Sequence, residues 1–127
     1  MPRNKDIEAF VAGYSPEVQV IVEAARTSLR ELLPGVTETL DRPAKLIGFE
    51  YGPGYTGVVF TLLLTAKGAK IGIGCAANLP DPKGLLKGSG KLHKHVPLNS
   101  PADLRTAGLK PLLTSAFMAW KIRTGAE

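Results

Sequence analysis

The stretch that decides the fold is YTGVVFTLLLTAKGAKIGIGCA, residues 55–76. Apolar side chains recur at every second position in both halves, which is typical of two strands that each bury one face. The halves 55–66 and 69–76 are joined only by Lys67 and Gly68, so we expect an antiparallel hairpin and not a parallel crossover. The apolar face comprises Val58, Phe60, Leu62, Leu64, Ile71, Ile73 and Cys75.

Glycines occupy the opposite face of the second strand. Gly72 and Gly74 alternate with Ile71 and Ile73, so they point away from the expected core. A backbone without side chains lets a helix or a ligand approach the sheet closely. Of the two, we expect a helix on this face.

Cys75 is the only cysteine of the chain. Its phase with Ile71 and Ile73 predicts a buried thiol, which is common for free cysteine. A catalytic thiol needs a partly exposed, electropositive setting or a neighbouring histidine. We therefore expect no catalytic residue here, and a single cysteine fits a reducing cytoplasm, where we expect the protein to reside.

Helices and further strands flank the hairpin. Apolar residues at helical spacing predict one amphipathic helix near each end of the chain. The expected elements are a short helix or arm at 6–14, helices from Pro16 to the break at Pro34 and from Leu109 to Arg123, and strands at 37–41, 44–51 and 92–98. The chain thus predicts a single α+β domain over residues 1–127, with a mainly antiparallel sheet of four or five strands and both amphipathic helices packed on it.

A second informative stretch is LLKGSGKLHKHVPLNSPADL, residues 85–104, which contains both histidines of the protein. Its segment 87–91 predicts a loop, because two glycines allow positive φ and a close backbone approach to a ligand. In the strand that follows, His93 and His95 share one face, whereas Lys94 falls on the apolar face. A lysine on that face indicates an edge strand.

Three interpretations of this stretch stay open. The loop and strand could hold an anion, because backbone N–H groups and lysines suit a phosphate or carboxylate. His93 and His95 could bind a metal as neutral imidazoles, although the sequence names no third ligand. The stretch could also be only a basic, solvated edge strand. The candidate ligand-binding residues are Lys87, Ser89, Gly90, Lys91, His93, Lys94 and His95.

The segment KGSGKLHKHVPLNSPADL from Lys87, with PGVTET from Pro34 and RPA from Arg42, resembles the YdhG-like domain family over roughly residues 7–122. In that family a Gly-x-Gly-Lys turn precedes a basic residue, a histidine and an aliphatic-rich strand. The resemblance implies a small α+β domain, loosely grouped with YjbR-like and frataxin-like (CyaY-like) proteins. Some members are described as iron chaperones, which implies a metal-handling role for His93 and His95 as an alternative function.

The amino-acid composition limits the classes of binding partner that we expect. The 127 residues are 44% hydrophobic, enough for one core, and 16 Lys and Arg against 11 Asp and Glu give a net charge of +5. That excess favours anionic partners in general. No basic run is interleaved with aromatics, so nucleic acid is not an expected partner. No apolar run approaches the ~18 residues of a membrane span, so we expect no membrane insertion.

The expected function is therefore that of a small binding domain. The sequence shows neither a cofactor fingerprint nor an acid and base paired at a meaningful spacing, so binding is favoured over catalysis. The expected partner is a small anionic ligand or a protein. A metal ion at the two histidines is the one cofactor considered, and a homodimer could form through an uncovered face or edge of the sheet.

Overall fold

The computed structural model describes residues 5–52, 57–76, 79–88 and 93–125. Its elements are the helices α1 (Lys5–Ala12), α2 (Pro16–Leu32) and α3 (Leu109–Thr124), the 3₁₀ helix η3 (Pro101–Arg105), and the strands β1 (Thr37–Asp41), β2 (Leu46–Glu50), β3 (Val58–Leu64), β4 (Ala69–Gly74) and β5 (His93–Leu98). The strands form one sheet in the order β1-β2-β3-β4-β5, and every neighbouring pair is antiparallel. The α+β prediction is confirmed, with five strands.

Helix α2 begins where the sequence predicts. The Ser15 hydroxyl oxygen accepts a hydrogen bond from the Val18 N–H at 3.3 Å, which satisfies one donor of the first turn. Pro16 follows at a position where the missing N–H costs nothing. The chain enters η3 in a similar way, because a carboxylate oxygen of Asp103 accepts hydrogen bonds from the N–H groups of Asn99 and Ser100.

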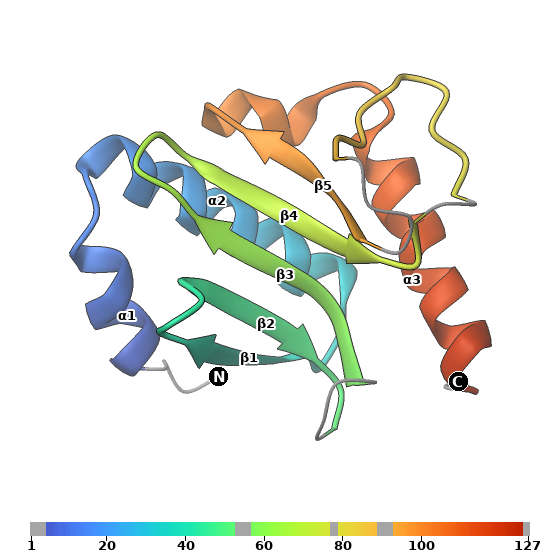
Figure 1. The fold of residues 1–127 in the computed structure, drawn as a ribbon, viewed down its shortest axis with the longest axis horizontal. Helices are drawn as coiled ribbons and strands as arrows, with labels where there is room; N and C mark the ends of the chain where they lie inside the picture. Colours follow the sequence, from blue (N-terminus) through green and yellow to red (C-terminus); the bar gives the residue numbers. More distant parts are fainter. Residues whose placement is uncertain (1–4, 53–56, 77–78, 89–92, 126–127) are drawn as a thin grey trace.

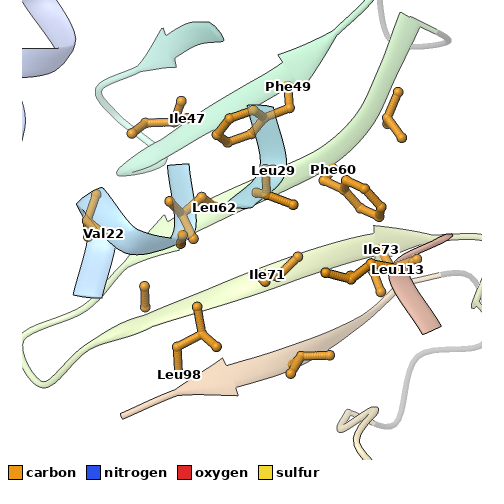
Figure 2. Close-up of a cluster of buried hydrophobic side chains, with 14 of the residues drawn as sticks. Val22, Leu29, Ile47, Phe49, Phe60, Leu62, Ile71, Ile73, Leu98 and Leu113 are labelled. Carbon is orange, nitrogen blue, oxygen red and sulfur yellow. The ribbon is translucent and has the colours of Figure 1, made fainter. Parts of the chain in front are cut away.

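One face of the sheet carries the core. Alternate side chains of the three central strands point toward α2 and toward the first half of α3 (Figure 2). Burial of each large apolar side chain contributes about 1.5–3 kcal/mol. The sheet supplies Ile47, Phe49, Phe60, Leu62, Ile71 and Ile73, and the helices supply Val22, Leu29 and Leu113 among others.

An ion pair fastens α2 to β1 at the margin of this core. The Arg26 side chain is 4% exposed, and its Nε donates to Glu38 at 2.6 Å while its Nη1 donates to Glu23 at 2.9 Å. Burial alone would lower the pKa of Arg26, but the two carboxylates outweigh it and the net shift is upward. The guanidinium is therefore charged at every accessible pH.

Strand β4 ends one residue before Cys75. The backbone of Cys75 has a φ of 54°, which breaks the alternation followed by Ile71 and Ile73. The residue is exposed, so the prediction of a buried thiol is wrong. Strand periodicity places a side chain correctly only while the chain remains extended.

The second face of the sheet is turned away from α2. Figure 1 is viewed from this side, with α2 behind β3 and β4. Antiparallel sheets commonly leave one face open in this way. No helix in the described ranges has the length and apolar character needed to cross a membrane. We call this second face the open face.

Candidate ligand-binding site

The strand register aligns five residues across the open face. Thr39 pairs with Gly48, Gly48 with Thr61, Thr61 with Gly72, and Gly72 with His95. Residues paired in this way project from the same face of a sheet. We call this set the glycine row: two glycines lie in its middle, a threonine separates them, and a polar residue stands at each end.

The row continues beyond β5. Lys87 forms an isolated antiparallel bridge with His95, in which the N–H of each residue donates to the carbonyl of the other at 2.7 and 3.0 Å. The pairing puts the side chains of Lys87 and His95 on the same face. Gly88, with a φ of 110°, lets the chain pass close to the His95 ring. The segment that precedes the Gly-rich loop thus belongs to the edge of the sheet.

Polar side chains of neighbouring residues lie close to the three glycines of this face. A Cβ at Gly72 would overlap the Thr61 hydroxyl, and one at Gly74 would lie 3.6 Å from Nδ1 of His93. The expectation that a helix packs on Gly72 and Gly74 is therefore wrong, because the nearest heavy atoms to a Cβ there belong to Thr61 and His93 of neighbouring strands. At Gly48, a Cβ would lie 3.6 Å from Oε2 of Glu50.

A hollow of about 940 Å³ extends over this part of the open face and reaches the end of α3. Glycine backbone and apolar side chains form much of its lining, and charged side chains lie around it. The lining consists of Thr39, Asp41, Leu46, Gly48, Glu50, Val58, Val59, Phe60, Thr61, Gly72, Ile73, Gly74, Cys75, His93, Lys94, Trp120, Arg123 and Thr124. Pockets of this size, mostly apolar with a few polar groups, are typical of small-molecule sites.

Charges of both signs line the hollow. Asp41 and Glu50 come from β1 and β2, whereas Lys94 and Arg123 come from β5 and α3. The Thr39 hydroxyl donates to Oε1 of Glu50 at 2.8 Å, which orients that carboxylate. The strand order therefore gives the hollow an acidic side at β1 and β2 and a basic side at β5, and Arg123 lines it from the end of α3.

Trp120 of α3 packs against the end of the sheet and forms one wall of the hollow. Its ring centroid lies 5.6 Å from that of Tyr51 and 6.2 Å from that of Phe117, and only 5% of the residue is exposed. The Tyr51 hydroxyl donates to the carbonyl of Pro34 at 2.7 Å, which fixes this cluster to the end of α2. Trp120 is a core residue, and it also lines the hollow.

The predicted site residues divide into three groups. Lys87, His93 and His95 lie on the open face, and Lys94 lines the hollow although its alternation places it on the core side. The pKa of His95 is lowered, first by burial and then by the charge of Lys70, so the imidazole is neutral at neutral pH. Ser89, Gly90 and Lys91 lie outside the described residues.

The metal prediction gains no third ligand from the described parts of the chain. His93 and His95 are two residues apart on one strand face, which sets their Cα atoms about 7 Å apart. Across the described ranges, no group of three or more His, Cys, Asp and Glu side chains could hold a metal ion. A metal bound at the two histidines would need ligands from elsewhere.

Sequence reasoning missed Glu50, Thr61 and Arg123. The missed signal was a repeated alternation: Gly48, Thr61 and Gly72 each sit between large apolar residues in three consecutive strands. Small residues in that position indicate a shallow strip across one face. Arg123 stands at the C-terminal end of a predicted helix, where a cation is common because it interacts favourably with the helix dipole.

Comparisons with family models, with curated proteins and with solved structures found no match for this chain.

Proposed function

We propose that this protein is a small-molecule binding domain, and that its ligand combines an apolar body with an anionic group. The observation that carries the proposal is the hollow, which places apolar side chains and bare glycine backbone beside the cations of β5 and α3. The apolar body rests on the glycine row and against Trp120. The anionic group meets Lys94 and Arg123.

The basic side of the open face supports an anion more than a cation. Lys70 of β4 and Lys87, which is bridged to β5, lie near His95 on the open face. Lys94 lies between the two histidines in β5 and starts from the opposite side of the strand. Cations converging on one region attract and orient an anionic group. A metal cation would be repelled by the same charges, and the described residues offer it only two imidazoles.

Trp120 supplies a direct test, because it is the only tryptophan of the chain and it lines the hollow. Caprylate, an eight-carbon carboxylate, is titrated into the protein while the tryptophan fluorescence is followed. We expect a saturable change in emission. Arg123→Gln combined with Lys94→Gln should weaken caprylate binding about tenfold, the effect of losing roughly 1.4 kcal/mol of charge-assisted contacts.

The matched control is Arg105→Gln combined with Lys67→Gln, which removes the same charge from exposed positions outside the lining. The control should leave caprylate affinity within twofold of the parent. If both double variants weaken caprylate binding equally, the loss comes from the change in net charge and not from contacts at Lys94 and Arg123. A fluorescence signal that does not change with caprylate would reject the proposed function.

A further inference from the structure

The acidic side of the hollow points to a second recognition element. We infer that the ligand is zwitterionic: besides the anionic group, it carries a cationic group that pairs with Glu50. The inference rests on the proposed function and adds to it the charge pattern of the ligand. A ligand with an anionic group alone would leave this carboxylate uncompensated.

Glu50 is positioned as a recognition group. Its Oε1 accepts the Thr39 hydroxyl at 2.8 Å, and its Oε2 lies above Gly48, 3.6 Å from where a side chain would begin. The carboxylate therefore lies over the floor of the hollow instead of extending into solvent. A hydrogen-bonded carboxylate in a fixed orientation binds an ammonium group at little entropic cost.

The separation of the two charged sides sets the shape of the ligand. Glu50 is on β2 and Lys94 is on β5, three strand spacings apart, or about 14 Å between their backbones. Between them the floor consists of Gly48, Thr61 and Gly72, with little side-chain bulk beyond the threonine. Lys94 starts from the core side of β5 and lines the hollow at its margin. An extended ligand of about this length therefore joins Glu50 to the cation of β5.

Asp41 adds negative charge to the same side. It lies at the far end of β1 from Glu50, pairs with Leu46, and already accepts the Ala44 N–H at 3.2 Å. Its contribution to the ligand is therefore a longer-range attraction, and Glu50 supplies the direct contact. The two carboxylates together oppose binding of a molecule that carries only negative charge.

Three linear probes separate the two ends of the site. Caprylate has only a carboxylate group and octylamine has only an ammonium group. ω-Aminocaprylate has both groups, one at each end of a chain of the same length. By isothermal titration calorimetry, we expect ω-aminocaprylate to bind the parent protein about threefold more tightly than caprylate, as for one partly exposed ion pair. Octylamine should bind more weakly than ω-aminocaprylate.

The order should reverse when the carboxylate is neutralised. In Glu50→Gln, the ammonium group has no charged partner and still loses hydration, so caprylate should bind more tightly than ω-aminocaprylate. Thr39→Val, which frees Glu50 from its hydrogen bond, should reduce the preference for ω-aminocaprylate without reversing it. Glu17→Gln, at an exposed position on α2, is the matched control and should keep the parent order.

The outcomes distinguish this inference from the proposed function. Caprylate binding that depends on Lys94 and Arg123, with no preference for ω-aminocaprylate or with the same preference in Glu50→Gln, overturns the zwitterion and leaves the anion site standing. Octylamine binding as tightly as ω-aminocaprylate also overturns it. Loss of all binding by caprylate and by ω-aminocaprylate rejects the proposed function itself.

Discussion

At the scale of single residues, His95 makes the stability of the fold depend on pH. Its pKa lies below the ordinary value of 6.5, because burial and then Lys70 disfavour the imidazolium. Above the ordinary value of 6.5, the imidazole is largely neutral in both the folded and the unfolded chain. As the pH falls below it, the unfolded chain takes up the proton first, so stability declines until the pH has passed through the folded pKa.

We therefore expect the free energy of unfolding to fall as the pH is lowered from about 7 to about 5, and to fall less steeply in His95→Gln. Urea denaturation at a series of pH values measures both slopes. In Lys70→Met, the pKa of His95 should rise only part of the way toward 6.5, because burial is the larger cause. An NMR titration of the imidazole checks this shift, with Lys67→Met as the control. A complete return to 6.5 would contradict the assignment of causes.

Also at the residue scale, Arg26 should be the most costly charge to leave unpaired. Its side chain is 4% exposed and that of its main partner, Glu38, is 11% exposed. Glu38→Gln leaves a buried guanidinium with Glu23 at 2.9 Å and Glu8 at 3.9 Å as its carboxylates, and we expect a loss of about 3 kcal/mol in the free energy of unfolding. Urea denaturation measures it against Glu31→Gln, an exposed carboxylate on α2. A loss below about 0.5 kcal/mol would show that the pair is not needed.

At the scale of elements, the packing of β3 on β4 explains Gly72. A side chain there would meet the Thr61 hydroxyl, and threonine has little rotamer freedom with which to yield. Gly72→Ala should therefore destabilise the protein by about 1–3 kcal/mol, the usual cost of overpacking. Thr61→Ala in the same chain should recover most of that loss. Thermal unfolding of the single and double variants tests this, and additive effects would contradict the proposed clash.

The same elements show what periodicity can predict. Alternation in 55–66 and 69–76 predicted two strands and their buried face, and the structure has them at Val58–Leu64 and Ala69–Gly74, with residues 55 and 56 outside the described residues. Helical spacing identified α2 and α3. Alternation could not reveal that the chain leaves the sheet at Cys75, since that depends on a backbone angle. It also could not say whether a helix or a neighbouring side chain would fill the space over Gly72, because that depends on the register between strands.

At the scale of the whole molecule, the candidate site combines parts that are distant in the chain. The sequence indicated the basic part of the site, because Lys87 to His95 are contiguous. It could not place Glu50 of β2 and Arg123 of α3 around the same hollow, because only the order of the strands and the position of α3 bring them there. The resemblance to the YdhG-like family and the metal alternative at His93 and His95 stay predictions.

The central claim is that a small amphipathic anion binds on the open face of the sheet. The most direct test is a ¹H–¹⁵N correlation spectrum of the labelled protein during titration with caprylate. The account predicts that the backbone amide signals of Gly48, Thr61, Gly72 and Gly74 shift together and saturate, while those of α1 and the middle of α2 stay in place. Shifts confined to the helix-covered side, or no saturable shift on the open face, would contradict it.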